Sequence, residues 1–165
     1  MKKIRVGVIG LGFIGKQHVE ALRRLPYIEI EAGSDSNLSM REWCEKNGIQ
    51  KYYSDYKEML TNENMDVVHN CTPNNFHYEV SCEILKTGCH VYSEKPLTIK
   101  SVEGESLIEL ADKKGLKTAV NFNYRNNLMV QEIQQRIQNG RMGMISHIQV
   151  EYLQDLSLIH ISEPT

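Results

Sequence analysis

Residues 4–15 read IRVGVIGLGFIG, an apolar run followed directly by three closely spaced glycines. The run 4–9 is apolar on both faces, as expected of a strand buried in a parallel sheet. The glycines fit the pattern G-x-G-x-x-G, and a helical pattern begins within them. In such a turn the first glycine permits a tight bend, the second lets the backbone approach a pyrophosphate, and the third lets helix and strand pack closely. The candidate cofactor contacts here are Gly10, Gly12, Phe13, Ile14 and Gly15.

The same alternation of apolar runs and helical patterns continues to about residue 122. Strands are expected at 4–9, 28–32, 52–53, 65–71, 90–93 and 118–122, and helices at 13–25, 38–47, 55–60, 76–87 and 101–114. Strand and helix in regular succession, joined by short links, predict a parallel sheet covered on both faces. The expected fold class is therefore α/β, a Rossmann-type doubly wound parallel sheet, with a dinucleotide-binding domain over residues 1–123.

The pattern changes after this domain. Residues 128–139 have helical spacing, and residues 144–153, MISHIQVEYL, alternate between apolar and polar side chains. A two-residue period is typical of a strand with one buried face, unlike the doubly buried strands before it. We expect residues 124–155 to contain the first helix and first strand of a second α/β domain that is truncated here.

The last ten residues, 156–165, read LSLIHISEPT. This decapeptide can be encoded in frame by a transposase adapter used in preparing sequencing libraries. We therefore expect residues 156–165 to be a non-native tail without function. The alternative is a genuine amphipathic tail that docks its apolar residues on the core.

Composition excludes several classes of protein. The chain has 165 residues, is 41% hydrophobic and 24% charged, and has a formal net charge of −2. The charges are scattered, so the basic stripe of a nucleic-acid binder is missing, and no apolar run approaches the ~20 residues of a membrane span. The four cysteines form no C-x-x-C pair, which favours reduced thiols, no metal site and a cytoplasmic location.

Asp35 follows the second predicted strand, 20 residues after the last glycine of the motif. An acid in this place accepts hydrogen bonds from the adenosine ribose of a dinucleotide. No lysine or arginine stands at positions 36–40 to hold a 2′-phosphate, so NAD is favoured over NADP. The alternative is an ordinary turn aspartate.

The fourth predicted strand is followed by TPNNFH, residues 72–77. Ligands of open parallel sheets bind outside the carboxyl ends of the strands. The candidate cofactor contacts in this segment are Thr72, Pro73, Asn74 and His77. Helix capping by an asparagine and a structural role for the histidine are the alternatives.

The fifth predicted strand runs into Glu94-Lys95-Pro96 at the same carboxyl edge. The glycine motif, Asp35, TPNNFH and EKP, in this order and spacing, closely resemble the Gfo/Idh/MocA family, named after glucose–fructose oxidoreductase and inositol 2-dehydrogenase. The resemblance covers residues 3–155 and includes NFNYR at 121–125 and GRMG at 140–143.

This resemblance implies an NAD-dependent oxidoreductase that acts on a sugar or polyol hydroxyl. It implies that Lys95 is catalytic, that Glu94 positions the lysine or contacts the nicotinamide ribose, and that Pro96 fixes the turn. Asn121 and Arg125 match residues that line the active site. Members of the family carry a second α/β domain with the substrate pocket, so we expect the 165-residue chain to be inactive alone and the full-length protein to be a homo-oligomer.

Two other functions fit parts of the pattern. A non-catalytic family member could bind dinucleotide as a sensor or scaffold, but the intact Lys95 argues against it. An S-adenosylmethionine-dependent methyltransferase can also pair a glycine-rich turn with an acid after the second strand. The EKP motif, and the lack of an aromatic-rich loop after the fourth strand, argue against this second alternative.

Overall fold

The computed structural model describes residues 3–151 and 153, so the expectation for residues 156–165 lies outside the described part. Six strands form one sheet in the order β3-β2-β1-β4-β5-β6, and every neighbouring pair is parallel. The strands are β1 (Ile4–Ile9), β2 (Ile28–Ser34), β3 (Tyr52–Tyr53), β4 (Val67–Asn70), β5 (His90–Ser93) and β6 (Thr118–Val120). The order reverses between β1 and β4, which is the switch point of a doubly wound sheet. The prediction of a Rossmann-type sheet is confirmed.

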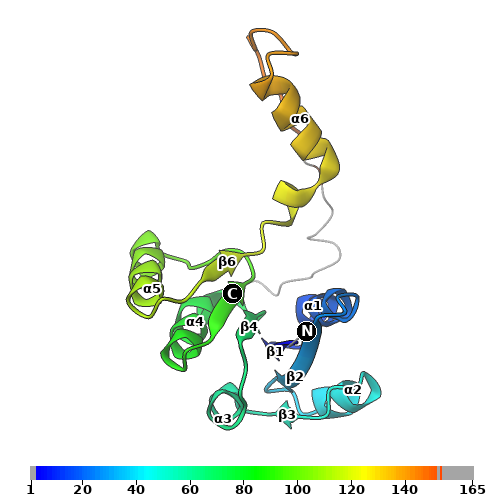
Figure 1. Ribbon diagram of the computed structural model, residues 1–165, viewed down its shortest axis with the longest axis vertical. Coiled ribbons are helices and arrows are strands. Elements are labelled where there is room, and N and C mark those ends of the chain that lie inside the picture. Colours follow the sequence, from blue (N-terminus) through cyan, green and yellow to red (C-terminus); the bar gives the residue numbers. More distant parts are fainter. Residues whose placement is uncertain (1–2, 152, 154–165) are drawn as a thin grey trace. The chain divides into compact units, whose positions relative to one another are not determined.

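Helices cover both faces of this sheet (Figure 1). They are α1 (Phe13–Arg23), α2 (Met40–Lys46), α3 (Tyr56–Asn62), α4 (His77–Lys86) and α5 (Ser101–Lys113). Figure 1 shows α1 and α2 on one side of the sheet and α3, α4 and α5 on the other. This division follows from right-handed crossovers that run in opposite directions from β1.

Each face has its own hydrophobic core. Beneath α1 and α2, the buried residues are Val6, Val8, Leu11, Val19, Leu22, Cys44 and Ile49. Beneath α3, α4 and α5, they are Ile9, Ala32, Met59, Leu60, Met65, Val68, Val80, Ile84, Leu85, Cys89, Val91, Leu107 and Ala111. Strand β1 contributes to both cores, which explains why its sequence is apolar on both faces.

Local signals set the ends of the helices. Asp55 precedes α3 and accepts a hydrogen bond from the backbone N–H of Lys57 at 2.8 Å, as an N-cap residue does. After α4 the chain turns at Gly88, whose φ of 90° lies in the region that favours glycine. The chain then enters β5 two residues later.

The strands end in register at one edge of the sheet. Ile9 is paired with Ser34 and with Asn70, and Asn70 is paired with Ser93. The first residue after each strand is then fixed by the neighbouring strand: Gly10 N–H donates to Ser34 at 2.8 Å, and Glu94 N–H donates to Asn70 at 2.9 Å. The loops that carry the sequence motifs therefore leave the sheet side by side.

Residues 1–122 form one compact unit, and a second begins at Asn123. The second contains a 3-10 segment, η2 (Asn123–Asn126), and the helix α6 (Leu128–Gln138), whose N-cap Asn127 accepts the N–H of Met129 at 2.9 Å. None of its described residues is buried.

The strand expected over residues 144–153 is not formed in the described residues of that segment, so this prediction was wrong. Apolar and polar side chains do alternate in this segment. A strand, however, also needs a neighbour whose N–H and C=O groups complete its hydrogen-bond ladder, and no described strand pairs with this segment.

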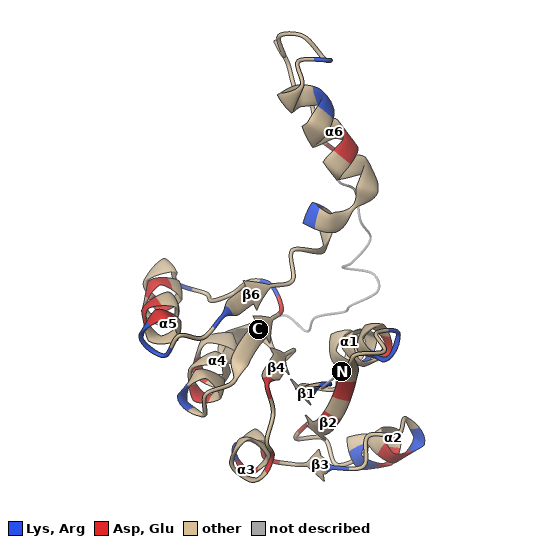
Figure 2. Cartoon of the chain, viewed as in Figure 1, with Lys and Arg blue, Asp and Glu red and all other residues tan. Residues whose placement is uncertain are grey.

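Charged residues of both signs are interspersed on the helices (Figure 2). Several pair within one helix, such as Lys46 with Glu42 at 2.5 Å in α2 and Lys86 with Glu83 at 2.6 Å in α4. Exposed pairs of this kind stabilise a helix only slightly. Among the described residues, no helix is both long and apolar enough to cross a membrane.

Candidate functional site

The three glycines of the motif differ in what surrounds them. Gly10 has a φ of 86°, and a Cβ there would lie 2.5 Å from the carbonyl oxygen of Cys71. A Cβ on Gly15 would lie 1.8 Å from the carbonyl oxygen of Gly10, so this glycine permits the close approach of α1 to the turn. A Cβ on Gly12 would meet no atom within 4 Å. Packing within the protein therefore explains Gly10 and Gly15 but not Gly12.

The bare backbone at Gly12 faces open space at the start of α1. Gly12 is the N-cap of this helix, and no side chain caps it. The next two residues are exposed, Phe13 by 70% and Ile14 by 39%. Unpaired backbone N–H groups at a helix start attract phosphate, so this turn fits a pyrophosphate.

Asp35 follows β2, and its carboxylate lies beside the glycine turn. Oδ2 accepts a hydrogen bond from the N–H of Leu11 at 2.6 Å, and Oδ1 accepts one from the N–H of Asn37 at 2.8 Å. The hydroxyl of Tyr52 donates to the backbone carbonyl of Asp35 at 2.6 Å. The carboxylate is thereby fixed in one orientation next to the pyrophosphate turn, where a ribose of the dinucleotide would lie.

The loop after β4 is organised by the buried side chain of Asn70. Its Oδ1 accepts hydrogen bonds from the hydroxyl of Thr72 at 2.7 Å and from the N–H of Thr72 at 3.3 Å. Its Nδ2 donates to Ser81 Oγ at 2.9 Å and to the carbonyl of His77 at 3.0 Å. Pro73 and Asn74 follow on the exposed surface, where Asn74 opens the 3-10 segment η1 (Asn74–Phe76).

His77, the first residue of α4, is fully buried at 0% exposure. Its Nε2 lies 2.8 Å from the carbonyl oxygen of Thr72, and its Nδ1 lies 2.5 Å from the carbonyl oxygen of Pro96. Both polar atoms of the ring are thus engaged within the protein.

Glu94 and Lys95 point to different environments although they are adjacent. Glu94 is 7% exposed, and its Oε1 accepts hydrogen bonds from Asn121 Nδ2 at 2.5 Å and from His18 Nε2 at 2.9 Å. Burial alone would raise the pKa of Glu94, but these bonds and one from the Lys95 N–H lower it below its usual value. Lys95 is exposed at the carboxyl edge of the sheet, and the Lys95–Pro96 peptide bond is cis.

The network around Glu94 extends to two further aromatic rings. His18 Nδ1 lies 2.8 Å from His69 Nδ1, and the rings of His69 and Tyr92 stack with their centroids 4.7 Å apart. The Tyr92 hydroxyl donates to Asn121 Oδ1 at 3.0 Å, which returns the network to Glu94. Burial, together with His18, lowers the pKa of His69 to about 3, so this ring is neutral at pH 7.

Sequence reasoning missed His18, His69 and Tyr92. A partial signal existed for His18, because it lies four residues before Leu22 on the buried face of the predicted helix. Its bond to Glu94 joins residues 76 positions apart, and no local pattern indicates such a contact.

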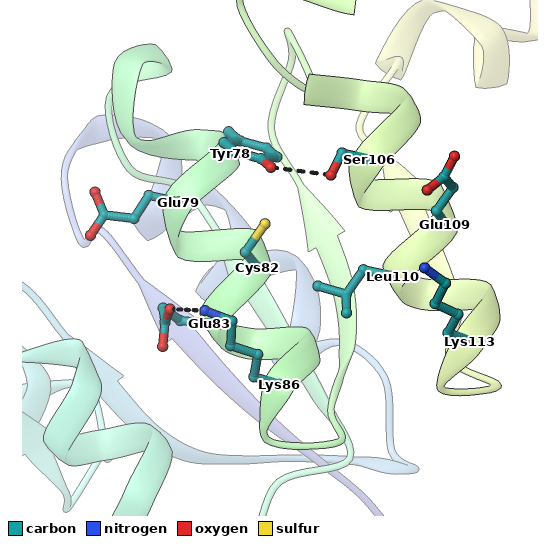
Figure 3. Close-up of a pocket in the computed structure, with 9 residues that line it drawn as sticks. All are labelled: Tyr78, Glu79, Cys82, Glu83, Lys86, Ser106, Glu109, Leu110 and Lys113. Carbon is teal, nitrogen blue, oxygen red and sulfur yellow. Dashed lines mark hydrogen bonds and ion pairs between the residues drawn. The ribbon is translucent and has the colours of Figure 1, made fainter. Parts of the chain in front are cut away.

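The described part of the first unit is hollowed in places that include the two below. One, of about 490 Å³, is lined by Gln17, His18, Ala21, Leu22, Leu25, His69, Tyr92 and Asn121. The other lies between α4 and α5 (Figure 3), where the Tyr78 hydroxyl donates to Ser106 at 3.3 Å and burial raises the pKa of Cys82. The groove between α4 and α5 contains no residue of the sequence motifs.

Arg125 belongs to η2 in the second unit. Its assignment to the active site therefore stays a prediction. Asn121 belongs to the first unit, where its amide bonds both Glu94 and Tyr92.

Comparisons with known proteins agree with this geometry. Residues 4–122 match the family model described as "Oxidoreductase family, NAD-binding Rossmann fold". The chain is 33% identical over 141 residues to the myo-inositol 2-dehydrogenase of Thermotoga maritima, a match that covers 85% of this chain and 42% of that protein. It is 34% identical over 144 residues to the D-glucoside 3-dehydrogenase of Escherichia coli, covering 86% and 41% of the two chains.

A solved structure is also similar. The WlbA dehydrogenase of Bordetella pertussis, crystallised with NADH and UDP-GlcNAcA, superposes with a TM-score of 0.82 at 29% identity, covering 87% of this chain and 42% of that one. The chain thus spans about two fifths of the length of these relatives. By its glycine turn, its sheet order and the family model that matches most of its length, this chain belongs to the Gfo/Idh/MocA oxidoreductase family and carries its NAD-binding Rossmann fold.

Proposed function

We propose that this chain supplies the cofactor-binding half of an NAD-dependent oxidoreductase that acts on a sugar or polyol hydroxyl. The observation that carries the proposal is the arrangement of three loops at one edge of the sheet. The glycine turn follows β1, the Thr72 loop follows β4 and Lys95 follows β5, and these three strands are neighbours. Relatives named as dehydrogenases of inositol and glucosides support the substrate class.

The residues divide the task of binding the cofactor. The backbone of the glycine turn holds the pyrophosphate at the start of α1. The carboxylate of Asp35 accepts the hydroxyls of the adenosine ribose and repels a 2′-phosphate. The Thr72 loop, with Pro73 and Asn74, contacts the cofactor further along the same edge.

The glycine turn, Asp35 and the Thr72 loop would hold NAD⁺, which would supply the hydride acceptor for the carbon that bears the substrate hydroxyl. Lys95 hydrogen-bonds that hydroxyl and helps to move its proton, a contribution worth about 10²–10⁴-fold in rate. Glu94 positions the Lys95 backbone from within the protein, because its Oε2 accepts the Lys95 N–H at 3.3 Å. The unit that begins at Asn123 is the start of the substrate domain, and substrate choice lies there.

The glycine turn gives the sharpest test of the cofactor half. Gly12→Val adds a side chain where the protein itself has room, so the variant should fold normally and lose at least tenfold in NADH affinity by calorimetry. Gly104→Ala in α5 is the matched control, because its Cβ would meet only Thr98 Oγ1 at 3.4 Å, and it should bind NADH like the parent. If the Gly12→Val variant and the parent bind NADH with equal affinity, the pyrophosphate does not bind at this turn.

Lys95 tests the catalytic half. In a chain as long as the relatives, Lys95→Met should lower kcat by about 10²-fold or more and leave NAD⁺ affinity almost unchanged. Tight NADH binding without turnover on any sugar or polyol by the longer chain with Lys95 intact would instead favour the dinucleotide sensor of the same family.

A further inference from the structure

The ring of His77 joins two loops that are distant in sequence. Thr72 belongs to the loop after β4, and Pro96, 19 residues after His77, belongs to the loop after β5. The ring lies between their carbonyl oxygens and is fully shielded from solvent. The two strands themselves are paired only up to Asn70 and Ser93, so the ring extends their connection beyond the sheet.

The chemistry of the two contacts fixes the number of protons on the ring. A backbone carbonyl can only accept a hydrogen bond, whereas a neutral imidazole has one donor nitrogen and one acceptor nitrogen. A neutral ring would place a lone pair against one of the two oxygens, at 2.5 Å or 2.8 Å. Exchanging the tautomer only moves this repulsion to the other oxygen. A ring that donates from both nitrogens satisfies both contacts.

We propose that His77 carries a proton on each ring nitrogen and acts as a positioning residue that ties the Thr72 loop to the Lys95–Pro96 loop. Its positioning role rests on the proposed function, which assigns these two loops to cofactor and substrate. Its protonation state rests on geometry alone.

Two physical terms oppose a cationic ring at this place. A buried charge loses its hydration, and the first turn of α4 is the positive end of the helix dipole. Hydrogen bonds in which the donor is charged are shorter and about twice as strong as neutral ones, and both ring contacts are short, at 2.8 Å to Thr72 and 2.5 Å to Pro96. The ring is therefore held by two strong bonds, and these bonds set the distance between the loops.

The effect reaches Lys95 through one peptide unit. The carbonyl that Nδ1 contacts belongs to Pro96, the residue directly after Lys95. On the other loop, the Thr72 carbonyl is held by Nε2 while its N–H and hydroxyl are held by Asn70. Loss of the ring leaves the Pro96 carbonyl without this contact, whereas Asn70 still holds the N–H and hydroxyl of Thr72.

Nitrogen NMR of the 165-residue chain, labelled with ¹⁵N-histidine and measured at pH 7, tests the protonation state. Comparison with His77→Gln assigns the signals. We expect both His77 nitrogens to show a directly bonded proton. His90 provides an internal reference for the opposite state, because its Nδ1 accepts the Lys117 N–H at 3.0 Å and so lacks a proton. One unprotonated nitrogen on His77 would overturn the proposal, and this result does not depend on whether the chain binds NADH.

Amide hydrogen exchange tests the positioning role. In His77→Gln we expect faster exchange at Thr72 and Lys95, unchanged protection at Val91 in the middle of the sheet, and NADH affinity about tenfold weaker. His90→Gln, at the opposite end of β5, is the matched control and should leave the exchange at Thr72 and Lys95 and the affinity unchanged. A uniform loss of protection across the sheet would show that His77 only stabilises the fold. Unchanged exchange at Thr72 and Lys95 would show that the ring does not hold the two loops together.

The parent chain could fail to bind NADH while His77→Gln still shows faster exchange at Thr72 and Lys95. In that case the proposed function is wrong, but the conclusion that His77 connects the two loops is supported.

Discussion

The two units of this chain each contain an amphipathic helix, but the apolar side chains of the helix are buried in the first unit and exposed in the second. In the first unit, α4 places Ile84 at 0% exposure within a core. In the second, α6 has an apolar stripe of the same kind, yet Ile133 is 48% exposed and Leu128 is 80% exposed. Amphipathic spacing therefore predicts a helix in both units, but stability comes from the layer against which its apolar face packs. Within the described residues, only the first unit has such a layer.

The largest expected effect tests this difference directly. Ile84→Ala should lower the free energy of unfolding by about 2–5 kcal/mol, because it leaves a cavity in a close-packed core. Ile133→Ala is the matched change in α6, and it should stay within about 0.5 kcal/mol of the parent. Urea titration measures both. Equal losses in the two variants would mean that the second unit has a core of its own.

The change in stability with pH should be caused by residues of the first unit. The pKa of His69 is about 3 in the folded chain, against about 6.5 in an unfolded one. Between these values the unfolded chain binds a proton that the native chain does not, so the free energy of unfolding falls as the pH falls. We expect His69 to contribute a loss of about 1–2 kcal/mol between pH 7 and pH 5, measured by urea titration as the difference between the parent and His69→Gln.

The variant His69→Gln should remove this contribution, and His147→Gln, at an exposed site in the second unit, should leave it unchanged. The lowered pKa of Glu94 acts in the same direction but only at lower pH, around the usual range of a carboxyl. The same slope in the parent and in His69→Gln would assign the pH dependence above pH 5 to other groups.

The preference for NADH over NADPH should also be determined by the first unit alone. We expect NADH to bind at least tenfold more tightly than NADPH, because the carboxylate of Asp35 repels a 2′-phosphate. Calorimetry on the whole chain and on a chain that ends at Phe122 should give the same preference, and Asp35→Asn should reduce it. A preference that disappears in the shorter chain would move part of the cofactor site into the second unit.

Much of the first unit could be predicted because its signals are local. The turn Gly10–Gly15 lies within six residues, and the predicted strand before it and helix after it both support a dinucleotide-binding turn. The sequence also indicated that Thr72 and Lys95 follow consecutive strands at the same carboxyl edge of the sheet. These inferences need only periodicity and the rule that ligands bind at the carboxyl ends of parallel strands.

The contacts that shape the site could not be predicted in the same way. The motif TPNNFH predicts a cofactor contact at His77, but the ring is buried and contacts the carbonyl of Pro96, 19 residues later. The alternation over residues 144–153 indicated a strand, but a strand also depends on a pairing partner. In both cases the outcome depends on a distant part of the chain, which residue spacing does not encode.

The carboxylate of Glu94 has a consequence for the order in which the chain assembles. Its two side-chain donors, His18 and Asn121, lie 76 residues before it and 27 residues after it. The complete network therefore cannot form until β6 has joined the sheet, and closing so long a segment has an entropic cost that must be met first. We expect Asn121→Ala to speed unfolding and to leave the folding rate almost unchanged in stopped-flow kinetics, since contacts made after the transition state act on unfolding. A variant that folds markedly more slowly would place this polar network in the folding nucleus.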